Sequence, residues 1–338
     1  MIIVLRPKTS KKEESTVLAE IRRLGYRPHV MRGVARTVIG AIGDERTHHT
    51  LEALTILPQV ESVTPIQKRF KLVSREAHPT NSTITLPNGC VIGGKELVVM
   101  AGPCSVESEK QLMLTAEAVA KAGAKVLRGG AFKPRTSPYE FQGLGEKGLK
   151  LLAKARKHTG LAIITELLSE DHAEMVAEYA DVLQIGTRNA QNFQLLIAAA
   201  KTGKPVLLKR GLAMKIEEWL LAGEYILSNT NPGLMFCERG IRTFETYTRN
   251  TLDLSTIPII KKESHCPIVI DPSQGAGRAD LVVAMCKGAA AMGADALLVE
   301  VHPNPKEAWS DGAQQLTLEG FAQLMQDLKP FAAAAGRA

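Results

Sequence analysis

The sequence is poor in aromatic residues and has no concentrated run of basic ones. Aromatic side chains make up 4% of the 338 residues, and the 42 Lys and Arg that outnumber 35 Asp and Glu are spread along the chain. A nucleic-acid-binding protein is expected to cluster its basic residues and to interleave aromatic ones, so no nucleic acid partner is predicted. The excess of positive charge is equally consistent with small anionic ligands.

Long apolar runs and paired cysteines are also missing. No apolar run approaches the roughly 18 to 20 residues that a membrane-spanning helix needs, and the basic and polar residues within positions 1–11 do not fit a signal peptide. The five cysteines include no C-x-x-C pair, which argues against a disulfide framework and against a zinc finger. We therefore expect a cytoplasmic protein with no membrane partner.

The first part of the chain, residues 1–70, has the pattern of a small α+β domain. Strand-like and helical segments follow in the order strand, helix, strand, strand, helix, strand, at 1–5, 11–24, 27–32, 36–42, 47–57 and 60–66. This order predicts a ferredoxin-like domain. Such a sheet leaves a face or an edge exposed, so a packing or oligomerising role and a ligand-sensing role both remain open.

A linker and a predicted hairpin over 71–94 lead into a regular alternation of strands and helices. Eight short runs rich in Val, Ile and Leu alternate with helical patterns, at 97–101, 125–127, 162–165, 182–185, 205–208, 234–236, 267–270 and 296–299. Continuous apolar strands are typical of a parallel sheet that helices cover. Eight repeats predict a (β/α)8 TIM barrel over 95–338, with a doubly wound open sheet as the alternative.

Cationic residues stand at or just beyond the ends of these apolar runs: Arg128, Lys133, Arg135, Arg188, Lys209, Arg210 and Arg239. A barrel brings the C-terminal ends of all its strands to one mouth, whereas an open sheet offers one crevice, so this pattern favours the barrel. Arginine and lysine bind phosphate and carboxylate oxygens, and the set therefore predicts two phosphorylated ligands. The alternative is a set of unrelated surface ion pairs.

Carboxylates and one cysteine form a second candidate set: Cys104, Glu166, Asp271, Glu300 and Asp311. A thiolate together with carboxylates from the first and last strands can hold a divalent transition metal. A buried cysteine is more often a small apolar side chain, but Gly102-Pro103 ends the strand before Cys104 and turns the cysteine toward the mouth.

Six motifs in order along the chain carry a resemblance to a known family. They are AGPCS at 101–105, LRGGA at 127–131, KPRTS at 133–137, LLKRG at 207–211, CERG at 237–240 and EVHP at 300–303. The chain resembles 3-deoxy-D-arabino-heptulosonate 7-phosphate (DAHP) synthase, in particular the type I beta subgroup with an N-terminal ACT-like, ferredoxin-like regulatory domain. The resemblance implies a homotetrameric transferase that condenses phosphoenolpyruvate with erythrose 4-phosphate, the first step of the shikimate pathway to aromatic amino acids.

The same resemblance implies roles for individual residues. Phosphoenolpyruvate would be bound by Arg128, Lys133, Arg188, Lys209 and Arg239, and the aldose phosphate by Pro134, Arg135, Thr136 and Ser137. A divalent ion, Mn, Fe, Zn or Co, would be held by Cys104, Glu300 and Asp311. The catalytic candidates are Lys133, which would protonate or polarise the aldehyde oxygen, Glu166 as the general base for water, and Asp271.

One position departs from the family. Where the family has D-P-S-H, this chain has Asp271-Pro272-Ser273-Gln274, and an amide oxygen is a weaker ligand than imidazole for such metals. Three outcomes stay open: a weakened but working metal site, catalysis without metal, or a non-catalytic barrel that binds a phosphorylated metabolite. Condensation with another aldose phosphate, as in octulosonate synthesis, is a further alternative, although the K-P-R-T-S motif favours the four-carbon aldehyde.

The resemblance also gives the N-terminal domain a regulatory role. In the resembling enzymes the ACT-like domain binds an aromatic end product of the pathway. His29 and Gly33 stand where that contact is made, and Met31 stands where a small hydroxyl residue often occurs. We predict tyrosine or phenylalanine as a feedback inhibitor.

Overall fold

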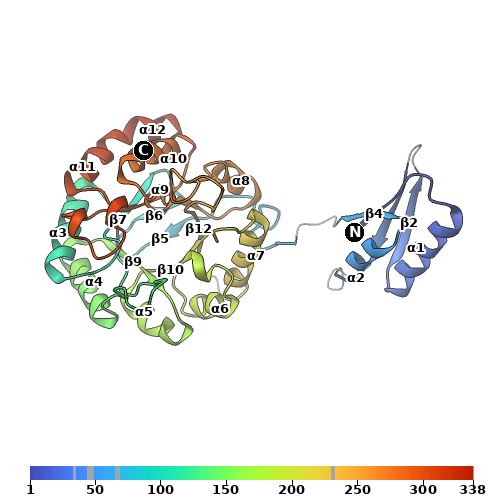
Figure 1. The fold of residues 1–338 in the computed structure, drawn as a ribbon, viewed down its shortest axis with the longest axis horizontal. Coiled ribbons are helices and arrows are strands. Elements are labelled where there is room, and N and C mark those ends of the chain that lie inside the picture. The colour runs from blue at the N-terminus through green and yellow to red at the C-terminus, as the bar shows by residue number, and fades with distance from the viewer. Residues whose placement is uncertain (33–35, 44–48, 65–68, 230–232, 338) are drawn as a thin grey trace. The chain divides into compact units, whose positions relative to one another are not determined.

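The computed structural model describes residues 1–32, 36–43, 49–64, 69–229 and 233–337. The chain divides into two compact units, Met1–Arg69 and Phe70–Ala338 (Figure 1). Each unit has buried apolar clusters of its own.

The N-terminal unit is a four-stranded antiparallel sheet with the strand order β2-β3-β1-β4. Its elements are β1 (Ile2–Leu5), α1 (Lys11–Arg23), β2 (Arg27–Arg32), β3 (Thr37–Ile42), α2 (His49–Glu52), the 3-10 helix η2 (Ala53–Ile56) and β4 (Val60–Thr64). The predicted ferredoxin-like fold is confirmed. The second helix is broken into α2 and η2, and residues 47–48 and 65–66 of the predicted helix and last strand lie outside the described residues.

The first helix of this unit shows why the local sequence folds as it does. Ser10 and Glu13 form a capping box, in which each side chain accepts a hydrogen bond from the other residue's backbone N–H. Val17 and Ile21, one helical turn apart, are fully buried against the sheet residues Ile3 and Ile39. The periodic apolar face therefore fixes which side of the sheet α1 covers.

The second unit is a closed barrel of eight parallel strands: β7 (Val98–Gly102), β8 (Val126–Arg128), β9 (Ala162–Leu167), β10 (Val182–Ile185), β11 (Val206–Lys209), β12 (Leu234–Glu238), β13 (Ile268–Ile270) and β14 (Ala296–Glu300). The last strand pairs with the first, Ala296 opposite Val98, so the sheet has no free edge. The predicted TIM barrel is confirmed, and the open-sheet alternative was wrong because it requires two unpaired edge strands.

Helices ring the strands, as Figure 1 shows: α3 (Glu109–Ala122), α4 (Glu146–Thr159), α5 (Ala173–Tyr179), α6 (Phe193–Lys201), α7 (Ile216–Leu227), α8 (Thr256–Glu263), α10 (Ala279–Ala291), α11 (Leu318–Asp327) and α12 (Lys329–Ala334). A one-turn helix, α9 (Pro272–Ala276), follows β13. None of the helices in the described ranges is long and apolar enough to cross a membrane.

The N-terminal end of the barrel is closed by a hairpin. Strands β5 (Ile84–Thr85) and β6 (Val91–Ile92) pair antiparallel. Their side chains Ile84 and Ile92 share one buried cluster with residues on the inside of the barrel, such as Met100 and Leu207. Apolar side chains therefore fill this end of the barrel, and polar chemistry is confined to the C-terminal mouth.

Candidate active site

The alternation of strand residues places polar side chains at the top of the barrel interior. In β11, Leu207 lies inside the barrel and Lys209 follows two positions later; in β14, Leu298 is followed by Glu300. Because side chains two apart in a strand point to the same face, these polar groups extend the inward-facing rows. The same spacing relates Arg128, Glu166, Gln184, Arg239 and Asp271 to apolar interior residues.

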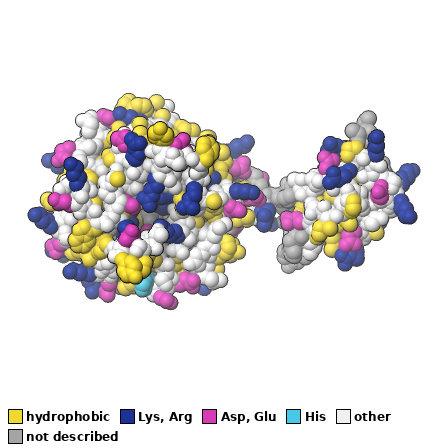
Figure 2. Space-filling view, in the orientation of Figure 1, with side chains coloured by type: hydrophobic (Ala, Val, Ile, Leu, Met, Phe, Trp, Pro, Cys, Tyr) yellow, Lys and Arg dark blue, Asp and Glu magenta, His cyan; other side chains and the backbone are white. Residues whose placement is uncertain are grey.

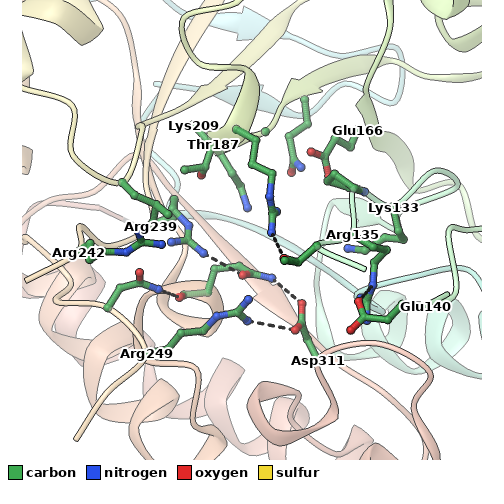
Figure 3. A pocket seen from close by; sticks show the side chains of 18 of the residues that line it. Lys133, Arg135, Glu140, Glu166, Thr187, Lys209, Arg239, Arg242, Arg249 and Asp311 are labelled. Carbon is green, nitrogen blue, oxygen red and sulfur yellow. Dashed lines mark hydrogen bonds and ion pairs between the residues drawn. The ribbon is translucent and has the colours of Figure 1, made fainter. Parts of the chain in front are cut away.

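These rows end in a cavity of about 410 Å³ at the barrel mouth. Eight cationic side chains line it, Arg128, Lys133, Arg135, Arg188, Lys209, Arg239, Arg242 and Arg249, together with three carboxylates, Glu140, Glu166 and Asp311. Figure 2 shows Lys and Arg side chains gathered around a hollow in this face, and Figure 3 shows them converging from several strands and loops. The cavity is therefore built for an anionic ligand.

Two nitrogen atoms in this cavity wall strengthen that conclusion. Arg128 Nε and Arg239 Nη1 are, within the described part of the chain, the buried side-chain nitrogens that have no hydrogen-bond partner. Burial also lowers the pKa of Arg239. An unpaired buried donor costs about 1–3 kcal/mol, so an anion that accepts hydrogen bonds from both arginines would be stabilised here.

Two buried ion pairs hold cations at the cavity. Arg128 Nη1 lies 2.5 Å from Glu300 Oε1, and Lys209 Nζ lies 2.5 Å from Asp271 Oδ2. The other oxygen of Asp271 accepts a hydrogen bond from the backbone N–H of Gln274 at 2.9 Å. Burial would raise the pKa of Asp271, but Lys209 and Arg128 outweigh it and the pKa falls. Asp271 is fully buried and its carboxylate contacts Lys209 directly, so it can fix the position of the Lys209 ammonium.

Lys133 lies beside the cysteine. Its Nζ is 3.1 Å from Cys104 Sγ and 3.2 Å from the Cys104 carbonyl oxygen, and the side chain is buried. Burial alone would lower the pKa of Lys133, but the negative charges around it, Glu166 and Glu300 among them, raise it. The ammonium therefore remains charged and can donate a proton into the cavity.

The loop after Lys133 carries the predicted aldose phosphate residues. Arg135 donates to Glu140 Oε2 at 2.7 Å and to Ser310 Oγ at 2.8 Å, and Thr136 Oγ1 accepts from Arg188 at 3.4 Å. Pro134, Arg135 and Thr136 line the cavity. Ser137 is not among the lining residues, and its Oγ accepts a hydrogen bond from the backbone N–H of Tyr139 at 3.3 Å.

The three predicted metal ligands come together. Cys104 Sγ and one carboxylate oxygen each of Glu300 and Asp311 lie within 4.8 Å of one another. Burial raises the pKa of the Cys104 thiol to about 12, with Glu300 acting in the same direction. One sulfur and two carboxylates are ligand types that divalent transition ions take, but they supply only three of the four protein ligands that the resemblance implies. Gln274 does not complete the set, since its Nε2 faces Glu300 and Asp311 at 3.0 and 3.3 Å.

Several cavity residues, Gln184, Arg242 and Arg249 among them, were not predicted from the sequence. Arg210 belongs to the predicted cationic set but does not line the cavity. Gln184 follows the period-2 row of Val182 and could have been found from that spacing, whereas Arg242 and Arg249 lie in a long irregular loop that has no period. Arg210 is turned away from the cavity and pairs with Glu238 and Asp253. It follows Lys209 directly, and successive strand residues point to opposite faces.

The candidate regulatory residues lie on an edge strand of the N-terminal unit. His29 and Met31 are two apart in β2 and exposed, whereas Val30 between them packs against the core. Both therefore point to the sheet face opposite that core. Gly33 lies outside the described residues.

Comparison with known proteins agrees with this geometry. Residues 77–333 match the model of the DAHP synthetase I family, and residues 1–68 match that of the DAHP synthase ferredoxin-like domain. The chain belongs to the DAHP synthetase I family. The predicted resemblance to DAHP synthase, including its ferredoxin-like N-terminal domain, is thereby confirmed.

Individual relatives place the chain within this family. It is 51% identical over 336 residues to the phospho-2-dehydro-3-deoxyheptonate aldolase of Thermotoga maritima, with 99% of both chains covered. A crystal structure of that DAHP synthase matches with a TM-score of 0.93 at 50% identity, covering 99% of this chain and 98% of the other. A 2-dehydro-3-deoxyphosphooctonate aldolase of Caulobacter vibrioides is 30% identical, over 74% of this chain and 91% of its own.

Proposed function

We propose that this chain condenses phosphoenolpyruvate and erythrose 4-phosphate with water, giving 3-deoxy-D-arabino-heptulosonate 7-phosphate and inorganic phosphate as the first step of the shikimate pathway. The observation that carries this proposal is the convergence of eight cationic side chains, two with unpaired buried donors, on one cavity. Similarity to a heptonate aldolase extends over 99% of the chain, whereas the octonate aldolase covers 74% at lower identity. Neither another aldose phosphate nor a non-catalytic barrel is favoured.

Substrate binding follows from the cations. Arg128 and Arg239 offer their free donors to the carboxylate and phosphate oxygens of phosphoenolpyruvate, and Lys133, Arg188 and Lys209 add positive charge around it. The loop Pro134-Arg135-Thr136-Ser137 would receive the phosphate of the aldehyde substrate. Asp271 acts as a positioning residue that holds Lys209.

The reaction needs one proton donor and one proton acceptor. The enol carbon C3 of phosphoenolpyruvate attacks the aldehyde carbon, and the alkoxide that develops takes a proton from Lys133 Nζ. Water adds to C2 and gives its proton to Glu166, which lines the same cavity (Figure 3). The bond between C2 and the phosphate oxygen then breaks, and the proton of the C2 hydroxyl leaves with the phosphate, which gives the ketone and inorganic phosphate.

A divalent ion, Mn, Fe, Zn or Co, has candidate ligands in Cys104, Glu300 and Asp311. Such an ion would supply a Lewis acid to the aldehyde oxygen, but Gln274 adds no fourth ligand, and the proton transfers given above do not require the ion. We also propose a homotetramer and inhibition by tyrosine or phenylalanine. The exposed His29 and Met31 on one face of β2 support a ligand contact there.

The activity assay follows the loss of phosphoenolpyruvate and the release of phosphate with erythrose 4-phosphate, and in parallel with arabinose 5-phosphate. Turnover is expected with the four-carbon aldehyde. Turnover only with arabinose 5-phosphate would move the assignment to octulosonate synthesis, and turnover with neither would leave a binding protein.

Substitution of Lys133 tests its role. Lys133→Ala is expected to abolish turnover, because general acid catalysis contributes about 10²- to 10⁴-fold and the charge is lost as well. Lys133→Arg keeps the charge but holds its proton too tightly to give it up, so kcat should fall while KM for phosphoenolpyruvate changes little. The exposed Lys147→Ala is the control. A near wild-type rate in Lys133→Ala would contradict the assignment.

A further inference from the structure

The hydrogen bonds of Gln274 identify which of its amide atoms faces the cluster of Cys104, Glu300 and Asp311. The amide Oε1 accepts from Arg239 Nη2 at 2.9 Å, and Nε2 donates to Glu300 Oε1 at 3.0 Å and Asp311 Oδ2 at 3.3 Å. A guanidinium has no acceptor, so the amide oxygen has to face Arg239. Gln274 therefore presents N–H groups to the cluster, where the resembling family presents an imidazole.

The opposite orientation of the amide is disfavoured by its surroundings. Turning it over would place its NH2 against the guanidinium of Arg239, and two donors would then face each other. Arg239 already has Nη1 buried without a partner, and Nη2 would become a second unpaired donor. The backbone of Gln274 is also fixed, since its N–H donates to Asp271 and its carbonyl accepts from Asn250 Nδ2 at 3.0 Å.

Protein donors reach all four carboxylate oxygens of the cluster. Glu300 Oε1 accepts from Arg128 as well as from Gln274, and Glu300 Oε2 accepts from Gln314 at 2.7 Å. Asp311 Oδ1 accepts from Arg249 at 3.0 Å, and Oδ2 accepts from Gln274 and the Cys104 thiol. Each carboxylate also faces an arginine, so neither needs a metal ion to offset its charge.

We propose that Gln274 is a hydrogen-bond donor to this cluster and not a metal ligand, and that the chain catalyses its condensation without a resident metal ion. This inference rests on the function proposed above. The protons balance without an ion. The aldehyde oxygen takes a proton from Lys133 as the carbon–carbon bond forms. The attacking water gives a proton to Glu166, and this proton restores the charge of Lys133. The Gln274 amide hydrogen-bonds to both Glu300 and Asp311 and so holds the two carboxylates together, as a bound metal ion would.

Cobalt binding tests the first half of the proposal without reference to activity. The full chain is stripped with a chelator and titrated with Co²⁺, and binding is read from the thiolate-to-cobalt absorption that Cys104 would produce. Gln274→His supplies a fourth ligand, and we expect it to bind Co²⁺ at least about 10-fold more tightly than the wild-type chain. Gln274→Ala removes the amide without adding a ligand and is the matched control. Equally tight Co²⁺ binding by the wild-type chain and Gln274→His would overturn the proposal.

Activity of the stripped proteins tests the second half. The wild-type chain is expected to keep its rate within about twofold after metal removal is verified by elemental analysis. Gln274→His should lose activity on stripping and regain it with Mn²⁺ or Co²⁺. A wild-type rate that collapses on stripping and returns with metal would overturn metal-free catalysis. Failure to turn over with or without metal would count against the condensation itself, and the cobalt titration would still decide the role of Gln274.

Discussion

Several cationic side chains at the barrel mouth are paired with carboxylates, and the mouth still carries a net positive charge. Lys209 is paired with Asp271, Arg128 with Glu300, and Arg249 with Asp311. Pairing makes the burial of Lys209 and Arg128 tolerable, because an isolated buried ion is strongly unfavourable, whereas Arg249 is exposed. The lining still holds eight cations against three carboxylates, and two arginine nitrogens lack a partner. The remaining positive charge is what a doubly anionic substrate meets.

Gly186 offers a test of the proposed base at this scale. A Cβ at this position would lie 1.9 Å from Glu166 Oε1, and the backbone there, with φ at −71°, is open to any residue. Gly186→Ala should therefore displace the Glu166 carboxylate without straining the main chain. If Glu166 accepts the proton of water, kcat should fall by about 10²-fold, with little change in melting temperature.

The control for this substitution is Gly40→Ala, where a Cβ would meet its nearest neighbours at an ordinary 3.8 Å. It should leave kcat unchanged. Steady-state rates and thermal unfolding of both variants provide the measurement. A kcat for Gly186→Ala within twofold of wild type would argue against Glu166 as the base.

Residues at strand ends were predictable from the sequence, and residues in long loops were not. Lys209 and Glu300 follow apolar strands, and a barrel gathers all such ends at one mouth. Arg249 reaches Asp311 from an irregular loop, where neither period nor spacing marks a side chain as functional. The orientation of the Gln274 amide depends on Arg239, far from it in sequence, and no local pattern encodes it.

At the scale of elements, the barrel strands were easy to recognise from the sequence, whereas one helix is only weakly marked in it. Each strand was recognisable because both of its faces are buried and it reads as a continuous apolar run. Helix α8 (Thr256–Glu263) is less clearly marked in the sequence, because it has eight residues and carries Pro258 inside, a residue that usually marks the end or first turn of a helix. Here the proline falls in the first turn, where its missing N–H has no helical partner to lose.

The segment between the N-terminal unit and the barrel strands is held by side chains of the barrel unit. Glu224 of α7 accepts the backbone N–H groups of Lys71, Leu72 and Val73 at 2.7 to 3.1 Å. His265 Nε2 donates to the Leu72 carbonyl at 2.8 Å, and its Nδ1 accepts from Ser82 Oγ at 2.7 Å. The hydrogen bond that Nδ1 accepts requires the neutral ring, whereas the Nε2 hydrogen bond is compatible with the neutral and the protonated ring.

This arrangement predicts a pH dependence of stability. Burial lowers the pKa of His265 from its usual 6.5, the hydrogen bond to the Leu72 carbonyl and the charge of Glu224 oppose this shift, and His78 and Arg75 add to it. Below pH 6.5 the unfolded chain binds a proton that the native chain excludes. The contribution of His265 is therefore fully present above pH 6.5 and declines as the pH falls toward and below the lowered value.

The measurement compares the free energy of unfolding in urea at pH 7.5 and pH 5 for wild type and His265→Gln, whose amide does not titrate. The stability advantage of wild type over the variant should shrink at pH 5. Amide exchange of residues 71–83 should quicken in parallel in the wild-type chain. An advantage that stays constant between the two pH values would contradict this role of His265.

At the scale of the whole molecule, the two units have separate cores. The buried clusters of the barrel unit begin at Phe70, and the N-terminal cluster is built from residues between Met1 and Val60. The cavity is lined by residues of the barrel unit alone. Catalysis and the proposed regulation are thus assigned to different units of the chain.

A chain of residues 70–338 should therefore fold cooperatively and keep kcat within about threefold of the full chain. The buried clusters that the barrel unit has of its own support the stability of such a fragment. Inhibition by tyrosine or phenylalanine should be present in the full chain and absent from the fragment, because His29 and Met31 are deleted. Initial rates against increasing tyrosine and phenylalanine measure both chains. Inhibition that survives in the fragment would locate the inhibitor site in the barrel, and flat rates in the full chain would remove the feedback hypothesis.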